Sequence, residues 1–329
     1  MISSIYAAVA RRRREWYAVR PEARRRLRHP VVSIGNIAVG GRGKTPFTAA
    51  VARMLLEMGE VPAILSRGYG RTDAADGAVV VRDRHGIRAD LARAGDEPLM
   101  LARQLDGAIV MAGADRYISG RVAEHHLGAT VHLLDDGFQH FQLDRDVDIV
   151  LVTERDLAGR TLPGGRLREP ADVLVAADAI VAVEEGTRVT AAHAAVFGAR
   201  RRVAPVVFDA TGGPPPPPGA RVLALAGIAE PEPFVAALAD DGWIVAATRI
   251  VSDHHPYSAW DLAEIVAAAR ASGAAAVVTT EKDVVRLLRY RPFAMPLGWA
   301  PLTMEPEPPD EFRRWLAVAV GAARDSIIG

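Results

Sequence analysis

The sequence contains no cysteine at all. This absence excludes disulfide bonds, thiolate metal sites and cysteine nucleophiles, and it is consistent with a reducing compartment. Net charge is also missing, since 40 basic residues balance 40 acidic ones, so we expect no broadly basic surface for nucleic acid. No uninterrupted apolar run of about 18 residues occurs, which argues against a membrane-spanning helix.

What the sequence does contain is enough apolar material for more than one core. The 329 residues are 50% hydrophobic and 24% charged, which excludes global disorder. At roughly 150 residues per domain, this length predicts two domains.

The zero net charge hides a basic N-terminal segment. Residues 1–30 carry nine arginines against two glutamates, and apolar residues precede the arginines, which reverses the order of a signal peptide. Ile2, Ile5 and Val9 fall roughly on one face of a helix. Two interpretations follow: a basic segment that lies on an anionic bilayer, or a helix packed on its own domain with a solvated arginine face.

Short apolar runs alternate with helical stretches from residue 31 onward. Such alternation predicts a mostly parallel sheet covered by helices on both faces. Residues 73–94 interrupt it with a possible small hairpin. The strands expected in the first half are Val31–Ile34, Ala63–Leu65, Ala108–Met111, Val131–Leu134, Val147–Val152 and Ile180–Val183.

Five consecutive prolines, Pro214–Pro218, give the clearest break in the pattern. They cannot lie inside a helix or a central strand, and we interpret residues 211–219 as a semi-rigid linker. The alternation then resumes. The sequence thus predicts an N-terminal segment over residues 1–30, an α/β domain over 31–210, and a smaller α/β domain over 220–329.

A glycine-rich turn follows the first expected strand and precedes a helix. Its end, Gly43-Lys44-Thr45, matches a phosphate-binding loop in the required strand–loop–helix setting, although Ala38 stands where the general pattern has glycine. Backbone N–H groups of such a loop wrap phosphates, the lysine reaches the outer phosphates and the threonine can ligate Mg²⁺. The residues expected at a nucleotide are Gly40, Gly41, Arg42, Gly43, Lys44 and Thr45.

Acidic residues stand where other expected strands and helices meet. Asp135 and Asp136 end the run Val131–Leu134, at the sheet edge where ligands bind, and can hold Mg²⁺ together with Thr45. Asp96 opens a helical stretch, so it is either a helix cap or a general base. In the second half, Asp253-His254-His255 is the densest titratable cluster, and a histidine oriented by a carboxylate is more plausible there than a metal site.

Taken in order along the chain, these motifs resemble the tetraacyldisaccharide 4'-kinase family of lipid A biosynthesis. The series covers about residues 1–290, and the family also lacks the leading glycine of the general phosphate loop. The motifs that carry the resemblance are Ser33–Asn36, Gly40–Pro46, Ser66–Gly70, Gly95–Pro98, Ala114–Arg116, Leu134–His140, Leu162–Pro170, Asp253–His255 and Thr280–Asp283.

The resemblance implies a fold, a reaction and roles for residues. The fold is α/β, with a phosphate-loop kinase domain built on a mostly parallel sheet flanked by helices, and a smaller α/β domain that closes over the active-site cleft. The reaction transfers the γ-phosphoryl group of ATP to the 4'-hydroxyl of a tetraacylated glucosamine disaccharide 1-phosphate. Asp96 is the implied base, tuned by His254. The implied supporting residues around nucleotide, metal and sugar are Glu97, Arg116, His140, Arg168 and Glu169.

The resemblance also implies a peripheral protein on the cytoplasmic face of the inner membrane, with residues 1–30 as the contact and no obligate protein partner. An alternative from another class is a nucleotide-gated ATPase on the membrane surface that phosphorylates no lipid. A soluble small-molecule kinase is a third possibility, but it leaves the basic N-terminal segment unexplained.

Overall fold

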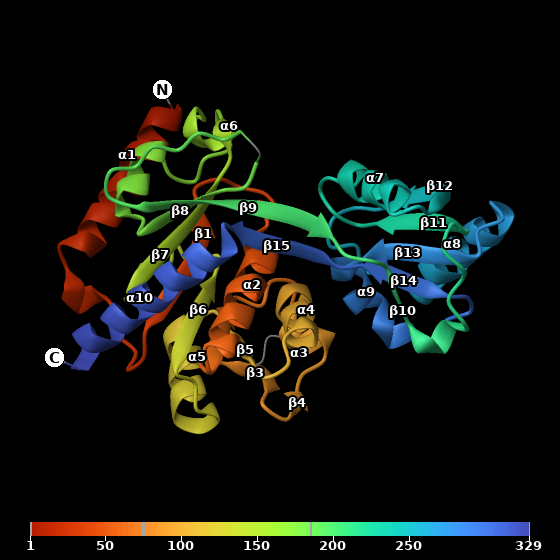
Figure 1. Cartoon of the computed structure of the whole chain (residues 1–329), viewed down its shortest axis with the longest axis horizontal. Coiled ribbons are helices and arrows are strands. Elements are labelled where there is room, and N and C mark those ends of the chain that lie inside the picture. Colours follow the sequence, from red (N-terminus) through yellow and green to blue (C-terminus); the bar gives the residue numbers. More distant parts are fainter. Residues whose placement is uncertain (1, 74–76, 185, 329) are drawn as a thin grey trace. The chain divides into compact units, whose positions relative to one another are not determined.

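The computed structural model describes residues 2–73, 77–184 and 186–328, which form two compact units. The larger unit consists of Met1–Arg201 with Met304–Gly329, and the smaller unit consists of Arg202–Thr303. Both units are α/β, as the sequence predicts, and each is built on a mostly parallel sheet (Figure 1).

The larger unit has a ten-stranded sheet in the order β15-β9-β8-β7-β1-β6-β2-β5-β3-β4. In chain order these strands are β1 (Val31–Asn36), β2 (Pro62–Ser66), β3 (Val79–Asp83), β4 (Gly86–Ile87), β5 (Ile109–Ala112), β6 (Val131–Asp135), β7 (Val147–Val152), β8 (Ala179–Ala182), β9 (Ala195–Val203) and β15 (Leu302–Glu307). Strand β1 pairs in parallel with β6 and β7, and every residue of these three strands is buried. Burial on both faces explains why these strands are continuous apolar runs.

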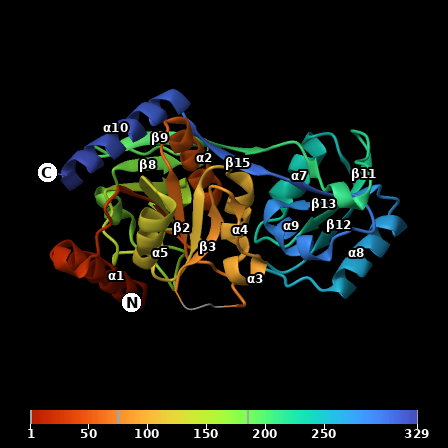
Figure 2. The same cartoon turned by 90° about the horizontal axis from the view of Figure 1, so that it is seen from below.

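Helices cover both faces of this sheet. They are α1 (Ile2–Ala18), α2 (Lys44–Glu57), α3 (Leu91–Ala94), α4 (Asp96–Gln104), α5 (Arg116–Val122), the π-helical turn η2 (Ala123–Leu127), α6 (Glu154–Leu157) and α10 (Pro309–Ile328), with short 3₁₀ turns η1 (Pro21–Ala23) and η3 (Ala171–Ala176). Figure 2 shows α2 and α10 on one face and α1 and α5 on the other. Helix α2, which follows the glycine-rich turn, and the basic helix α1 therefore lie on opposite faces of the sheet.

The smaller unit has a five-stranded sheet in the order β10-β14-β13-β11-β12. Its strands are β10 (Val207–Phe208), β11 (Arg221–Ala226), β12 (Ile244–Ile250), β13 (Ala276–Thr280) and β14 (Leu297–Ala300), and its helical elements are η4 (Ala210–Gly212), α7 (Glu232–Asp240), α8 (Ala259–Ala271), α9 (Glu281–Leu287) and η5 (Leu288–Tyr290). Alternate residues of β11 face opposite cores: Leu223 and Leu225 pack with α8 and α9, whereas Val222 and Ala224 pack with α7. This is the period-2 pattern of a sheet buried on both faces.

The unit boundaries differ from those expected from sequence. Residues 304–329 belong to the larger unit, because β15 adds to its sheet beside β9 and α10 packs on it. Phe312 of α10 makes edge-on contacts with Phe47 of α2 and Phe197 of β9, at centroid distances of 5.6 and 5.0 Å. The prolines Pro214–Pro218 lie within the smaller unit, so the expected linker at residues 211–219 does not separate the two units.

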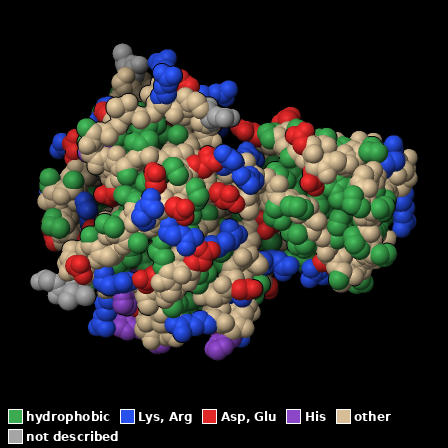
Figure 3. Space-filling model, viewed as in Figure 1, with side chains coloured by type: hydrophobic (Ala, Val, Ile, Leu, Met, Phe, Trp, Pro, Cys, Tyr) green, Lys and Arg blue, Asp and Glu red, His purple; other side chains and the backbone are tan. Residues whose placement is uncertain are grey.

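The local expectations of strand and hairpin are confirmed. Each of the six expected strands of the first half overlaps an observed strand, and β3 and β4 form an antiparallel hairpin. Residues 74–76 of the interrupting segment lie outside the described residues. Within the described ranges, every helix is too short or too polar to cross a bilayer. On the face shown in Figure 3, the larger unit carries basic and acidic side chains intermixed rather than sorted by sign.

Candidate active site

The phosphate loop lies between the end of β1 and the start of α2. Gly40 and Gly43 have left-handed backbones, with φ of 107° and 75°, which only glycine adopts without strain. The side chain of Met304 occupies the space that a Cβ on Gly43 would need, whereas nothing lies within 4 Å of a Cβ on Gly41. Gly43 is the residue that caps α2, so the positive end of this helix faces the loop.

Lys44 and Thr45 connect the loop to the two expected acids. The Lys44 Nζ atom lies 3.2 Å from the side-chain oxygen of Asn36 and 3.5 Å from Oδ1 of Asp136. The Thr45 hydroxyl donates to Asp135 at 3.1 Å. Thr48, one helical turn further on, donates to the other oxygen of Asp135 at 3.1 Å. The structure thus brings together the residues expected at phosphate and metal.

The pKa values of Asp135 and Asp136 are shifted in opposite directions. Burial, together with the negative charges of Glu97 and Asp136, raises the pKa of Asp135 to about 7. Burial also acts to raise the pKa of Asp136, but the cations of Lys44 and Arg168 outweigh it and hold that pKa below its usual value. A buried carboxylate beside two other acids favours a cation, and the oxygen donors of Asp135, Asp136 and Thr45 suit Mg²⁺.

These donors are fewer than a protein-only metal site requires. Among residues 2–73, 77–184 and 186–328, no group of three or more histidine, aspartate or glutamate side chains is placed to hold a metal. Mg²⁺ commonly takes one or two carboxylates and completes its shell with water and nucleotide phosphates. The arrangement therefore fits a metal that arrives with a nucleotide.

Arg42, expected at the nucleotide, is held by an acid of the protein. Its guanidinium donates to Asp156 at 2.8 Å, and the two side chains are exposed by only 11% and 2%. Asp156 also closes a capping box with Thr153 at the start of α6. Arg42 therefore braces the phosphate loop against α6.

Asp96 is the first residue of α4, and Gly95 is its cap, so the helix-cap interpretation of Asp96 is wrong. Asp96 is 5% exposed, and its carboxylate lies 3.8–3.9 Å from a Cβ built on Gly70. A Cβ there would make only ordinary contact with this acid, so glycine at position 70 is required by its φ of 79° rather than by space.

Arg116 is buried and His140 is partly buried among the same charges. Burial and the cation of Arg67 lower the pKa of Arg116 to about 10, while Asp135 and Asp136 act in the opposite direction. Burial and the cations of Arg116 and Arg145 lower the pKa of His140 to about 4. His140 is therefore neutral at pH 7.

Arg168 and Glu169 complete the group in the larger unit. One nitrogen of Arg168 contacts both oxygens of Asp136, at 3.1 and 2.9 Å. Glu169 is bound by Arg14 of α1, a residue that sequence reasoning did not select. Ala7, Arg11 and Arg14 are spaced so that they lie on one face of a helix. That spacing was the feature of the sequence that could have indicated a packed face containing Arg14. Asn36, Thr48 and Gln139 were also missed as site residues.

His254 belongs to the smaller unit, where three charged side chains surround it. Its ring nitrogens lie 3.0 Å from Lys282 Nζ and 3.2 Å from an Arg286 nitrogen, and Asp253 is 3.9 Å away. Its backbone is left-handed, with φ of 59°. Asp96 and His254 lie in separate units, and their pairing stays a prediction.

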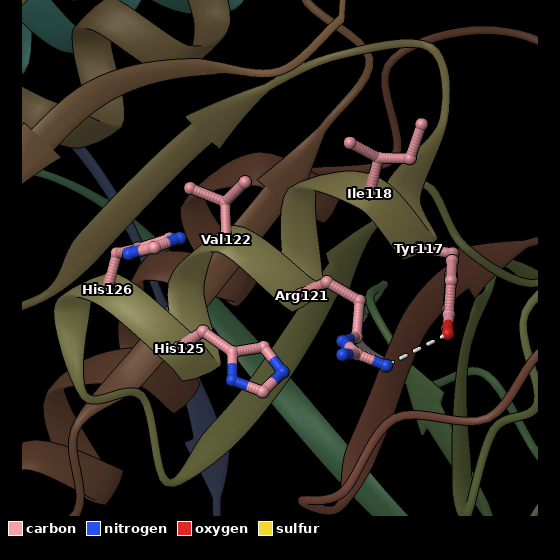
Figure 4. A pocket seen from close by; sticks show the side chains of 6 residues that line it. All are labelled: Tyr117, Ile118, Arg121, Val122, His125 and His126. Carbon is pink, nitrogen blue, oxygen red and sulfur yellow. Dashed lines mark hydrogen bonds between the residues drawn. The ribbon is translucent and has the colours of Figure 1, made fainter.

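A shallow depression of about 650 Å³ lies on the outer face of α5 and η2 (Figure 4). Its side chains all come from this one helical stretch, and Arg121 donates to the Tyr117 hydroxyl at 3.2 Å. None of the expected site residues lines it. The lining residues are Tyr117, Ile118, Arg121, Val122, His125 and His126.

A known protein family matches nearly the whole chain. Residues 1–320 match the family described as tetraacyldisaccharide-1-P 4'-kinase. The tetraacyldisaccharide 4'-kinase of Geobacter metallireducens is 40% identical over 296 residues, covering 87% of each chain. That of Rhodopseudomonas palustris (strain CGA009) is 41% identical over 268 residues, covering 78% of this chain and 74% of that one.

A solved structure is also similar. The crystal structure of LpxK from Aquifex aeolicus in complex with ATP has a TM-score of 0.81 and 29% identity, covering 97% of each chain. Similarity over the whole fold and over most of the sequence leads to one conclusion: the chain belongs to the tetraacyldisaccharide-1-P 4'-kinase family.

Proposed function

We propose how this chain performs the reaction of its family, the ATP-dependent phosphorylation of the 4'-hydroxyl of a tetraacylated glucosamine disaccharide 1-phosphate in lipid A biosynthesis. The loop Gly40–Thr45 binds the phosphates of ATP through backbone N–H groups and the start of α2. Lys44, 3.5 Å from Asp136, turns its ammonium toward the β- and γ-phosphates when nucleotide binds.

Asp135, Asp136 and Thr45 are the residues that would hold Mg²⁺. Bound there, the ion would offset negative charge on the phosphates. Arg168 orients Asp136, and Thr48 orients Asp135, through the contacts described above. Arg116 places a second cation near the acid pair. Positioning and charge stabilisation supply most of the catalysis in phosphoryl transfer, so these roles suffice on the phosphate side.

Asp96 accepts the proton of the attacking sugar hydroxyl. It is buried at the start of α4, where it is not the cap. His254, presented by the smaller unit, tunes this acid. Glu97, His140 and Glu169 support the surrounding charges. An in-line attack needs the base, the hydroxyl and the γ-phosphorus aligned, and we propose that these residues hold them so.

The acceptor carries acyl chains, and α1 is suited to a lipid surface. Its outer face exposes Ile2 by 69%, Ile5 by 60% and Val9 by 64%, with Trp16 at 43%. Its other face is bound to the larger unit through Ala7, Arg11 and Arg14. We therefore place the protein peripherally on the cytoplasmic face of the inner membrane, with residues 1–30 in contact with an anionic bilayer.

The observation that carries this proposal is the contact of Lys44 and Thr45 with the acid pair at the end of β6. The test is transfer of labelled γ-phosphate from ATP to the acylated disaccharide in detergent micelles. Stoichiometric consumption of ATP with the disaccharide supports it. Slow ATP hydrolysis that the disaccharide does not change would instead favour a membrane-surface ATPase.

A further inference from the structure

Two arginine–carboxylate pairs join α1 to residues 169–172, and their surroundings differ sharply. Arg14 forms a two-pronged contact with Glu169, at 2.9 and 2.8 Å, and these side chains are only 14% and 3% exposed. Arg11 contacts a single oxygen of Asp172, at 3.0 and 2.7 Å, and these side chains are 44% and 60% exposed. A buried, bidentate pair is costly to break, whereas an exposed pair contributes little. Arg11 therefore serves as a matched control for Arg14.

Aromatic rings and a backbone carbonyl fix the Arg14 side chain further. Its guanidinium carbon lies 4.1 Å from the centre of the Phe138 ring and 4.9 Å from that of Phe141, and one nitrogen contacts the Phe138 carbonyl at 3.4 Å. Phe138 in turn packs so closely on β1 that a Cβ added to Gly35 would lie 2.5 Å from its Cβ. The loop after Asp136 is thus clamped between α1 and β1.

From Glu169 an unbroken series of contacts reaches the phosphate loop. Gln139 donates to Glu169 at 3.0 Å and to the Asn36 carbonyl at 2.9 Å. The amide oxygen of Gln139 accepts from Arg168 at 3.4 Å, and the same Arg168 nitrogen contacts both oxygens of Asp136. Asp136 lies 3.5 Å from Lys44. Helix α1 is therefore connected to the phosphate-loop lysine through polar contacts alone.

Asp136 depends on its partners for its position. Its φ of 56° lies in the left-handed region, which aspartate tolerates better than most residues, so the side chain is held by its contacts with Arg168 and Lys44 rather than by backbone strain. Without Arg14, the buried carboxylate of Glu169 would draw on the guanidinium of Arg168, which is linked to it through Gln139: Gln139 donates to Glu169 and accepts from Arg168. Arg168 would then leave Asp136.

We propose that Arg14 is a positioning residue: by pairing with Glu169 it keeps Arg168 on Asp136, so that Asp136 and Lys44 are correctly placed only when α1 is docked. This inference rests on the proposed function, because it assigns Asp136 and Lys44 to Mg²⁺ and ATP. According to this proposal, nucleotide binds normally at Lys44 only when helix α1, which exposes an apolar face, is packed on the larger unit.

The test compares full-length Arg14→Ala and Arg11→Ala proteins. Binding of a fluorescent ATP analogue is titrated against Mg²⁺ without lipid, and turnover is then measured with acylated disaccharide in detergent micelles. Loss of an indirect partner of a metal ligand typically costs 10–100-fold. We expect Arg14→Ala to raise the Mg²⁺ concentration for half-maximal nucleotide binding about 10-fold and to lower kcat by about 10-fold or more. KM for the disaccharide should stay unchanged, and Arg11→Ala should leave the Mg²⁺ dependence unchanged.

A double-variant comparison separates this role from simple stabilisation. In Glu169→Gln the neutral amide no longer competes for Arg168, so adding Arg14→Ala to it should shift the Mg²⁺ dependence little further. Equal, additive shifts in both backgrounds would overturn the inference, as would a lowered melting temperature with unchanged Mg²⁺ dependence. If Arg14→Ala does not fold, Arg14→Lys keeps the charge without the two-pronged geometry and should shift the Mg²⁺ dependence in the same direction; no shift would overturn the inference.

The wild-type protein distinguishes the two levels of the proposal. If it binds no ATP analogue at any Mg²⁺ concentration, the nucleotide site itself is wrong and the inference falls with it. If it binds the analogue and Arg14→Ala binds equally well with the same Mg²⁺ dependence, only the role of Arg14 is wrong.

Discussion

The two units use the same sheet edge in opposite ways. In the smaller unit, the chain fills this edge with a carboxylate of its own. Asp283 is fully buried and accepts hydrogen bonds from the Gly227 backbone at 2.9 Å, the Tyr257 hydroxyl at 3.0 Å, Thr280 at 2.7 Å and Arg286 at 3.1 Å. A Cβ on Gly227 would lie 2.6 Å from that carboxylate, so the turn after β11 is closed around it.

In the larger unit, Asp135 at the corresponding edge is likewise buried and accepts from Thr45 and Thr48, but the acid after it faces outward. The Asp136 side chain is 38% exposed, and its partners Lys44 and Arg168 are charged side chains that can turn toward another anion. The glycine turn before α2 leaves open space at Gly41. The difference teaches that a parallel-sheet edge becomes a stabilising centre when an internal acid satisfies it, and a phosphate site when glycines keep it open.

The sharpest way to break this comparison is Asp96→Asn. Removing a general base typically costs about 10²–10⁴-fold in kcat. Asparagine keeps the shape of this buried side chain, so the loss of kcat should exceed any change in thermal stability. Labelled-phosphate transfer and thermal unfolding measure the two effects. Asp90→Asn is the matched control, because Asp90 caps α3 by accepting from the Arg93 backbone. Wild-type turnover in Asp96→Asn would remove the acid from the mechanism.

In the smaller unit, Asp283→Asn should lower stability rather than turnover. Removing one partner of a buried ion pair costs about 3–5 kcal/mol of unfolding free energy, because Arg286 loses its buried anion. Chemical denaturation followed by hydrogen exchange in β13 would measure this loss. The control Asp253→Asn removes an exposed pair with Lys282 and should cost less than about 1 kcal/mol. A small effect of Asp283→Asn would mean that the two edges are alike.

Lys44→Met tests the larger unit's edge directly. Losing one preorganised donor to developing charge costs about 10²–10³-fold in kcat, and ATP should bind more weakly. Lys282, in the first turn of the helix that follows β13 in the smaller unit, is the comparison. Lys282→Met should leave ATP affinity unchanged when nucleotide binding is measured without lipid. Equal losses of ATP affinity in both variants would contradict the division of roles between the units.

Sequence alone predicted those parts of the site that are local in the chain. Gly40–Thr45 form one strand–loop–helix motif, and Asp135 and Asp136 end a strand that pairs with β1 in register. Parallel pairing then places the acids beside Thr45. The local sequence pattern determines where the loop and the acid pair lie, so the motifs were enough to predict this part of the site.

What the sequence could not give depends on contacts between distant segments. Arg14 and Glu169 are 155 positions apart, and neither residue type reveals the other. The prolines Pro214–Pro218 marked irregular chain correctly, but the unit boundary depends on which sheet the next strand joins. Helix α10 likewise belongs to the larger unit because of its aromatic packing on α2, which no local pattern specifies.

The smallest expected effect concerns pH and two histidines of the larger unit. His132 is fully buried and His140 is partly buried, and burial lowers the pKa of both, that of His140 to about 4. Glu124, which pairs with His132 at 3.1 Å, raises its pKa, as does Asp146, while His29 lowers it, but burial dominates.

Below the unfolded-state pKa of about 6.5, the unfolded chain binds protons that these folded histidines do not, so stability is full above that pH and falls as pH drops from about 6.5 toward 4. One group changes the unfolding free energy by at most about 1.4 kcal/mol per pH unit. Asp135, whose pKa is raised to about 7, takes up a proton in the folded state over the same range and offsets this loss. The histidine contribution is therefore measured as the difference in hydrogen exchange of β6 between wild type and variant from pH 7.5 to 5.5. His132→Gln or His140→Gln should lose less β6 protection than wild type on acidification, and an unchanged slope in both variants would assign the acid sensitivity to other groups.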